Sequence, residues 1–110
     1  MQGDVRRADD WDRMIADLAA TLGGFDILVN NAGVQTWGPL YDLSEADWDL
    51  VIDTNLKGCF LGTRAAGRRM RDHGGGVIVN IGSGANRTPF PNLASYTASK
   101  GGIEMLTKVA

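Results

Sequence analysis

Cysteine and histidine are nearly missing from this 110-residue sequence, and their scarcity excludes several kinds of chemistry. The single cysteine, Cys59, allows no disulfide within the chain, and we interpret it as a buried, inert thiol in a reducing compartment. With His73 as the only histidine, neither a zinc ligand set nor a serine–histidine–aspartate triad can be assembled. We therefore expect no metal site, and a catalytic function would have to depend on other side chains.

Long apolar runs and a large charge of one sign are also missing. No run approaches the roughly 20 apolar residues that cross a bilayer, and the polar start Met1–Asp4 lacks the apolar centre of a signal peptide. The net charge of −2 argues against a nucleic-acid or membrane partner. The hydrophobic content of 44% is typical of a globular protein, which we expect in the cytoplasm.

What the sequence does contain is an alternation of helix and strand patterns, with no internal repeat or linker. Apolar residues at helical spacing predict three helices: residues 9–22, 44–73 and from about 95 to the end. Short apolar runs with β-branched residues predict two buried strands: residues 25–29 and 77–81. Ser44 is a predicted N-cap, Gly23 a predicted helix stop, and residues 82–93 a predicted loop.

This order predicts an α/β fold, a doubly wound, Rossmann-like parallel sheet with helices on both faces. In such folds ligands gather at the carboxyl ends of the strands, where the turns at residues 30–33 and 82–84 fall. Two strands cannot cover three helices, and a complete domain of this type needs roughly 150 residues. We expect residues 1–110 to be the central portion of one domain, from a partial record or a truncated gene product, which alone neither folds cooperatively nor turns over substrate.

Two polar features suit proton chemistry. Tyr96 and Lys100 lie four residues apart on a predicted helix and share one face. A lysine charge nearby favours the phenolate and lowers the pKa of the tyrosine, which would let it exchange a proton with an alcohol or carbonyl. Ser83, at the end of the second strand, could hydrogen-bond a substrate oxygen. An exposed pair and an ordinary turn serine are the structural alternatives.

Two further features involve side-chain amides and glycine. Asn55 occupies a helix position where the apolar pattern expects leucine, so it is either a satisfied structural amide or part of a site. The run Asn30-Asn31-Ala32-Gly33 directly after a strand suits a turn that presents backbone to a ligand, or simply a turn. The run Gly82-Ser83-Gly84 begins like a dinucleotide-binding motif, but the third glycine and the following helix are missing, and we reject it.

Taken together, these features resemble the short-chain dehydrogenase/reductase family. The matching motifs are Asn30-Asn31-Ala32-Gly33, Asp53-Thr54-Asn55-Leu56, Asn80-Ile81-Gly82-Ser83 and Tyr96-Thr97-Ala98-Ser99-Lys100. Their order and spacing fit the family across essentially the whole chain. The resemblance implies an oxidoreductase that uses NAD or NADP for reversible hydride transfer with a ketone or secondary alcohol, such as a 3-oxoacyl thioester or a sugar.

The resemblance also implies roles for single residues. Tyr96 would be the general acid/base, Lys100 would lower its pKa and hydrogen-bond the nicotinamide ribose, and Ser83 would orient the substrate oxygen. Asn55 would hold a water in a proton relay to Lys100. The residues implied to line the cofactor, besides Tyr96 and Lys100, are Asp4, Val5, Asn31, Ala32 and Gly33.

The sequence departs from the family in what it lacks. The family's glycine-rich turn has no counterpart, nor does the residue that selects NAD or NADP. Small residues on the last helix (Ala98, Gly101 and Gly102) allow close helix approach, and family members commonly pair through this helix. We expect a homodimer or homotetramer for the full-length protein, with packing inside one subunit as the alternative. The second functional hypothesis is a truncated, non-catalytic nucleotide-binding or oligomerisation module, against which the four intact catalytic positions argue.

Overall fold

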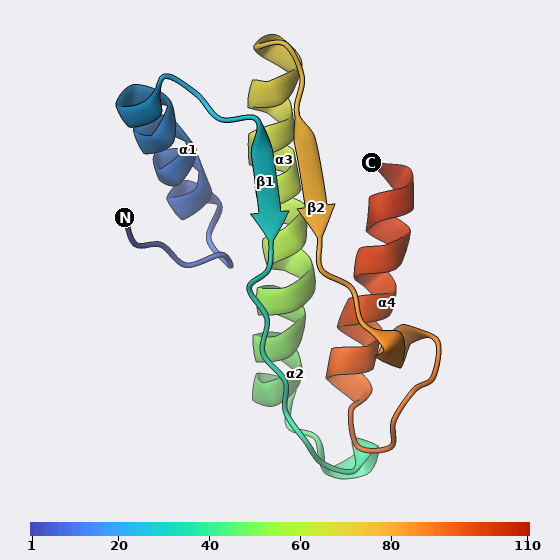
Figure 1. Ribbon diagram of the computed structural model, residues 1–110. Coiled ribbons are helices and arrows are strands. Elements are labelled where there is room, and N and C mark those ends of the chain that lie inside the picture. Colours follow the sequence, from blue (N-terminus) through green and yellow to red (C-terminus); the bar gives the residue numbers. More distant parts are fainter.

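The computed structural model describes all residues 1–110 and contains four α-helices and two strands (Figure 1). In chain order these are α1 (Ala8–Leu22), β1 (Ile27–Asn30), α2 (Glu45–Val51), α3 (Gly58–Asp72), β2 (Val77–Asn80) and α4 (Ala94–Val109). Two short 3₁₀ turns are η1 (Leu40–Asp42) and η3 (Gly84–Asn86), and α2 continues into α3 through a π-helical turn, η2 (Ile52–Lys57). All predicted helices and strands are confirmed, with boundaries shifted by a few residues.

The predicted helix boundaries have the expected chemistry. Ser44 caps α2, because its side chain accepts a hydrogen bond from the backbone N–H of Asp47 at 3.1 Å. Gly23 ends α1 in the left-handed conformation, with φ +78°, which glycine adopts without steric cost. The helix predicted over residues 44–73 is interrupted only by the π-helical turn, a type of irregularity that often marks a functional site.

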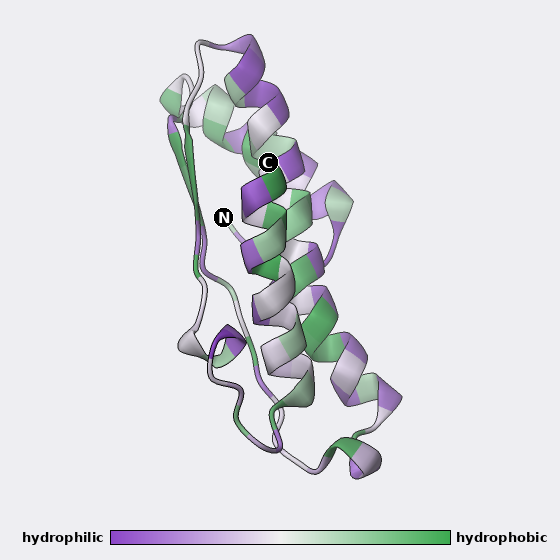
Figure 2. Ribbon diagram, turned by 90° about the vertical axis from the view of Figure 1, so that its right-hand side faces the viewer, coloured by the Kyte–Doolittle hydropathy of each residue, from purple (hydrophilic) through white to green (hydrophobic).

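The two strands are parallel and pair in register from Ile27 with Val77 to Asn30 with Asn80. All helices lie on one side of this sheet (Figure 2). The expectation of helices on both faces is therefore wrong for these residues. The strands are not fully buried either: Ile27, Val29 and Val77 are exposed, because they point away from α3.

Because no helix covers the other face of the sheet, which we call the bare face, the molecule is open and elongated. The radius of gyration is 15.1 Å, against about 13 Å for a compact domain of this length. The accessible surface is 6864 Å², against about 5900 Å² for a folded monomer of this mass. The chain thus exposes apolar surface that a complete sheet of this kind would cover.

The core lies where α4 packs against η2 and α2. Val51, Asn55, Ser95 and Ser99 are fully buried there. Gly102 allows this packing, since a Cβ atom at its position would lie 2.7 Å from a Leu56 methyl group. Packing inside one subunit therefore explains Gly102. No helix of the chain is sufficiently long and apolar to span a bilayer.

Candidate active site

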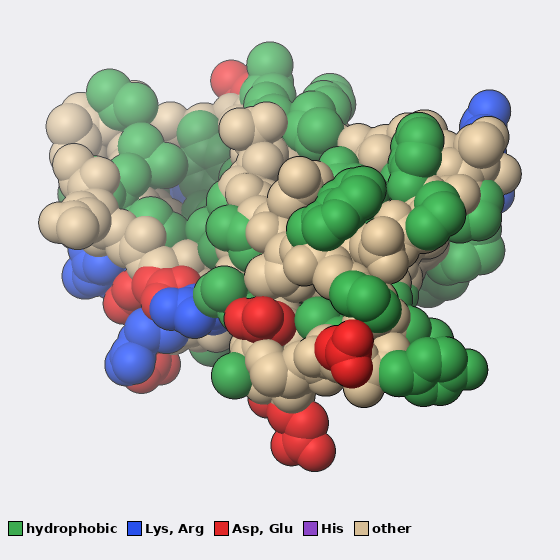
Figure 3. All heavy atoms as spheres, turned by 90° about the horizontal axis from the view of Figure 1, so that it is seen from below, with side chains coloured by type: hydrophobic (Ala, Val, Ile, Leu, Met, Phe, Trp, Pro, Cys, Tyr) green, Lys and Arg blue, Asp and Glu red, His purple; other side chains and the backbone are tan.

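The fold gathers the sequence-predicted residues at the end toward which both strands point. The turn at residues 31–33 follows β1 and the turn at residues 82–84 follows β2. The first half of α4 packs against η2 beside them, which brings Tyr96 and Lys100 near Asn55. Hydrophobic side chains spread over this end of the molecule (Figure 3), and the exposed ones include Trp37, Tyr41 and Phe90.

Asn55 joins the loop after β1 to α4. Its Oδ1 accepts from the Val34 N–H at 2.8 Å, while its Nδ2 donates to the Val34 carbonyl at 2.9 Å and to Ser99 Oγ at 3.1 Å. The side chain is 1% exposed, so these bonds are protected from water and leaving them unmade would be costly. Both amide hydrogens are used, so a water at this residue could be bound only through an oxygen.

Ser99 extends this network to the tyrosine. Its hydroxyl donates to the Tyr96 carbonyl at 2.7 Å while it accepts from Asn55. Sequence reasoning missed Ser99, which is fully buried, and also Ser95, whose hydroxyl lies 3.4 Å from Thr36 Oγ1. The two serines are four residues apart, so a shared polar stripe beside Tyr96 was the available signal.

Lys100 is buried without a carboxylate partner. It is 6% exposed, its Nζ donates to the Ile81 carbonyl at 3.0 Å, and it takes part in none of the ion pairs of the chain. The Nζ atom lies 5.6 Å from the centre of the Tyr96 ring. An ammonium group has three donors, so Lys100 keeps donors for a ligand and places a positive charge beside the tyrosine.

Tyr96 and Lys100 border a hollow of about 390 Å³ together with the turn after β1. Its other lining residues are Asn31, Gly33, Val34 and Gln35. Lys100 also borders a second, smaller cavity of about 100 Å³, which Val5, Ala32 and Asn55 line as well. The structure thus brings three of the four predicted catalytic residues, and four of the five other predicted cofactor residues, around the Lys100 side chain.

Ser83 lies slightly apart from this group. Its hydroxyl accepts from the Ala85 N–H at 3.1 Å and thereby begins the η3 turn. It lines a neighbouring hollow of about 480 Å³, with Asn86, Arg87 and Glu104 among the other lining residues. The hydroxyl hydrogen stays free to donate, which is what binding a substrate oxygen requires.

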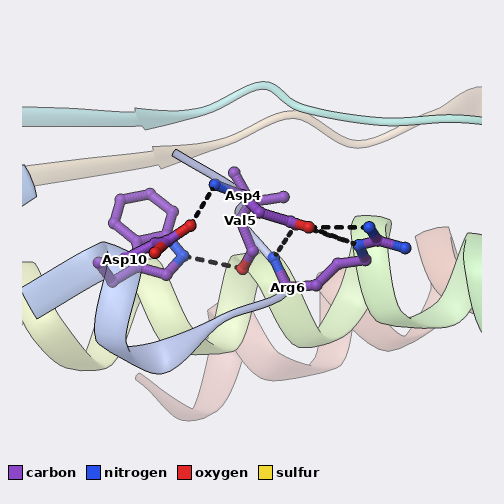
Figure 4. A network of polar contacts seen from close by, with 5 residues as sticks. Asp4, Val5, Arg6 and Asp10 are labelled. Carbon is purple, nitrogen blue, oxygen red and sulfur yellow. Dashed lines mark hydrogen bonds and ion pairs between the residues drawn. The ribbon is translucent and has the colours of Figure 1, made fainter. Parts of the chain in front are cut away.

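Asp4 is held by contacts with residues close to it in the sequence (Figure 4). Its carboxylate accepts from the Arg6 side chain at 2.8 Å and from the Arg6 N–H at 2.9 Å, and its own N–H donates to Asp10 at 2.8 Å. The hydrogen bonds from Arg6 lower the pKa of Asp4 to about 2. The neighbouring Val5 carbonyl accepts from the Trp11 indole at 2.9 Å. Asp4 borders neither of the cavities next to Lys100.

Cys59 is buried, as predicted, and burial raises the pKa of its thiol. A thiol in this state is a weak nucleophile. No three histidine, cysteine or acidic side chains lie close enough together to hold a metal ion. The chemistry that this arrangement can perform is proton transfer at Tyr96, beside the buried charge of Lys100.

Comparison with known proteins identifies the family. The family model for short chain dehydrogenases matches residues 1–110, the whole length of the chain. The chain belongs to the short-chain dehydrogenase family, and the resemblance found from its motifs is confirmed.

Its similar relatives are longer enzymes. The chain is 39% identical, over all of its length and 45% of the relative, to 3-oxoacyl-(acyl-carrier-protein) reductase FabG of Staphylococcus aureus. It is 42% identical, over 90% of the chain and 40% of the relative, to gluconate 5-dehydrogenase of Gluconobacter oxydans. The crystal structure of a gluconate 5-dehydrogenase from Burkholderia cenocepacia, in complex with NADP and tartrate, superposes with a TM-score of 0.93 at 38% identity, over 97% of the chain and 42% of that protein. The chain therefore spans less than half the length of each of these proteins. The similarity of the structures confirms that the chain has a Rossmann-like fold.

Proposed function

We propose that the protein to which this chain belongs is an NAD- or NADP-dependent oxidoreductase that interconverts a ketone and a secondary alcohol. The observation that carries this proposal is the environment of Lys100. A buried ammonium group with unused donors borders the same hollow as Tyr96 and the turn at residues 31–33. Family membership and the names of the relatives support the same reaction class.

Each of the four candidate catalytic residues has its own role in the proposed reaction. Tyr96 gives a proton to the carbonyl oxygen of the substrate or takes one from its hydroxyl, and the Lys100 charge stabilises the phenolate form. Ser83 donates a hydrogen bond to the same substrate oxygen. Asn55 fixes the turn after β1 relative to the Tyr96 backbone through Val34 and Ser99. The bound nicotinamide supplies or accepts the hydride.

The lining of the hollow fits part of such a cofactor. The exposed residues Asn31 and Gly33, together with the free donors of Lys100, line this hollow and suit the hydroxyl groups of a ribose, and exposed Ala32 lies between them in the chain. The hollow of about 390 Å³ is within the range of small-molecule sites. We assign the nicotinamide ribose to these residues and the adenine side to Asp4 and Val5. The Burkholderia structure contains NADP, and we leave either NAD or NADP as the cofactor.

The proposal also covers the class of substrate and the oligomeric state. Relatives named for 3-oxoacyl reduction and gluconate oxidation support a polar ketone or a secondary alcohol as substrate. The Ala98 and Gly101 side of α4 remains open, since a Cβ atom at Gly101 would meet nothing within 4 Å. We expect a homodimer or homotetramer through this helix, working in the cytoplasm.

The replacement Tyr96→Phe in the full-length protein tests the proposal. Removing the phenolic hydroxyl should lower kcat by roughly 100- to 10,000-fold, the usual contribution of general acid–base catalysis. The affinity for NADPH, measured by fluorescence titration, should stay unchanged. NADH and NADPH oxidation would be followed with a 3-oxoacyl thioester and a keto sugar acid.

The matched control is Tyr41→Phe, which removes the same hydroxyl from a side chain that is 97% exposed. This variant should keep full activity. Undiminished turnover by Tyr96→Phe, or no turnover of any ketone by the unmodified protein, would refute the proposed function.

A further inference from the structure

The chain segment that carries Ser83 is hydrogen-bonded to α4 at two points, one before Ser83 and one after it. On one side, Lys100 Nζ donates to the carbonyl of Ile81 at 3.0 Å, two residues before Ser83. On the other side, Asn86 Nδ2 donates to Glu104 Oε2, three residues after Ser83. Lys100 and Glu104 are four residues apart in α4 and so lie on one face of the helix.

The contact between Asn86 and Glu104 is the only side-chain hydrogen bond from residues 82–93 to α4. Inside the turn, the remaining bonds are local: the Ala85 N–H donates to Ser83 Oγ, and the Arg87 N–H donates to the Gly84 carbonyl. Local bonds fix the shape of a turn but not its distance from a helix. That distance depends on the packing of buried Ala85 against α4 and on the carboxylate of Glu104.

The carboxylate of Glu104 is well suited to hold an amide. Its second oxygen, Oε1, accepts from Lys108 Nζ at 3.0 Å. The hydrogen bond from Lys108 and the positive charges of Lys108 and Arg87 lower the pKa of Glu104. The group is therefore ionised at neutral pH, and hydrogen bonds to an ionised acceptor are stronger than those between neutral groups.

We propose that Glu104 is a positioning residue for Ser83: by binding Asn86, it fixes the turn that carries Ser83 at its distance from Tyr96. This inference depends on the proposed function of Ser83 and Tyr96. Lys100 alone is a weaker anchor, because the same ammonium group is assigned to the cofactor. Both carboxylate oxygens of Glu104 are engaged, one by Asn86 and the other by Lys108, and we assign Glu104 no contact with substrate or cofactor: it acts through the turn.

Kinetics of the full-length protein provide the first test. Glu104→Ala and Asn86→Ala should each lower kcat roughly 10- to 100-fold, since displacement of a reacting group by about 1 Å has effects of this size. The Kd for NADPH should change less than about threefold. Glu104→Gln keeps an oxygen for the Asn86 amide and should recover most of the activity. The double variant Asn86→Ala with Glu104→Ala should be no slower than either single variant, because both changes remove one contact.

The matched control is Lys108→Ala, which removes the exposed ion pair on the same carboxylate and leaves the Asn86 contact in place. Its kcat should stay within twofold of the unmodified protein. A kcat within twofold for Glu104→Ala, multiplying effects in the double variant, or an equal loss of NADPH affinity would overturn the proposal.

Hydrogen exchange provides a second test that needs no turnover. The backbone N–H groups of residues 85–88 should exchange faster in Glu104→Ala than in Lys108→Ala, because the turn is released. Unchanged exchange would overturn the proposal even in an active enzyme. If the unmodified protein reduces no ketone, the proposed function fails, and the exchange rates decide by themselves whether Glu104 holds the turn.

Discussion

Two groups of polar residues at the strand ends differ in how they are held. The group around Asn55, Ser99 and Lys100 is buried, and its hydrogen bonds join η2, α4 and both strand-end loops across 19 to 44 sequence positions. The group around Asp4 and Arg6 is half-buried to exposed, and its bonds join residues at most six positions apart.

This difference shows that the geometry of one group depends on the tertiary structure and that of the other on nearby residues. The buried group can keep its shape only when distant elements are packed together, so its geometry depends on the fold. The exposed group depends on one ion pair, and exposed pairs contribute little to stability. The predicted proton-transfer end of the site is therefore set by the tertiary structure, whereas the predicted adenine end is set by the chain around residue 4.

The largest expected effect concerns residues 1–110 on their own. Four apolar side chains of the sheet, Ile27, Val29, Val77 and Val79, face solvent, so the hydrophobic stabilisation of the sheet is far below that of a complete domain. We predict a broad, non-cooperative thermal transition by circular dichroism and no ketone reduction. The full-length protein should unfold sharply under the same conditions. A sharp transition of the 110-residue chain would show that the buried group is self-sufficient.

The next largest effect is expected from Asn55→Ala in the full-length protein. The change leaves the Val34 N–H and carbonyl without their side-chain partner and removes the bond that Ser99 Oγ accepts. Unsatisfied buried groups of this kind predict a loss of about 2–4 kcal/mol in the free energy of unfolding, measured by urea denaturation.

The control for Asn55 is Asn31→Ala, which truncates an exposed asparagine at the same strand end. Measured without cofactor, this change should cost less than about 0.5 kcal/mol. Equal losses for the two variants would remove the distinction between buried and exposed amides on which the comparison depends.

Most of this arrangement was predictable from the sequence because it depends on spacing. The apolar periods predicted the helices and strands, and the four-residue spacing predicted that Tyr96 and Lys100 share one helix face. That Asn55 joins them in one site was implied by the family resemblance. The Asn55 side chain has hydrogen-bond partners for its oxygen and for both amide hydrogens, and this leaves open whether it also acts in a site. The catalytic roles of Ser83, Asn55, Tyr96 and Lys100 stay predictions.

Other features depend on contacts that no local pattern records. The bare sheet face follows from the absence of a second layer of helices among these residues, whereas the strand pattern of residues 77–81 indicated burial on both faces. Ser99 and Glu104 were missed because a serine or a glutamate on a helix is unremarkable until the position of the partner loop is known. The pairing of Arg6 with Asp4 was missed because it requires a turn, not a helix or strand.

A smaller effect is expected from Ser99→Ala, which removes one link of the buried group. Asn55 then loses one of its two acceptors, while the Tyr96 carbonyl keeps its place in the helix. We predict a loss of about 1 kcal/mol in the free energy of unfolding. The control is Ala20→Ser, which adds the same hydroxyl on the exposed side of α1 and should change stability by less than about 0.5 kcal/mol. A larger effect for Ala20→Ser would contradict the assignment.

The smallest effect concerns the exposed group and its response to acid. The hydrogen bonds from Arg6 lower the pKa of Asp4 from 3.8 to about 2 in the folded chain. A lowered carboxyl pKa contributes stability that is present above the unfolded value near 3.8 and is lost as the pH falls through about 2. The stability difference between the unmodified protein and Arg6→Ala should therefore be constant from pH 7 to 5 and disappear between about pH 4 and 2.

Carboxyl NMR titration measures the pKa of Asp4 directly. It also tests whether this pKa depends only on the neighbouring Arg6 or on the tertiary structure as well. In Arg6→Ala the pKa of Asp4 should return toward 3.8, whereas in Arg68→Ala, which removes an exposed arginine from α3, it should stay near 2. Because the contacts of Asp4 with Arg6 join neighbouring residues, the low pKa should also persist when Asn55→Ala weakens the buried group. A pKa of Asp4 that rose in Asn55→Ala would show that the adenine end depends on the same tertiary packing as the proton-transfer end, and the two groups would then form one cooperative site.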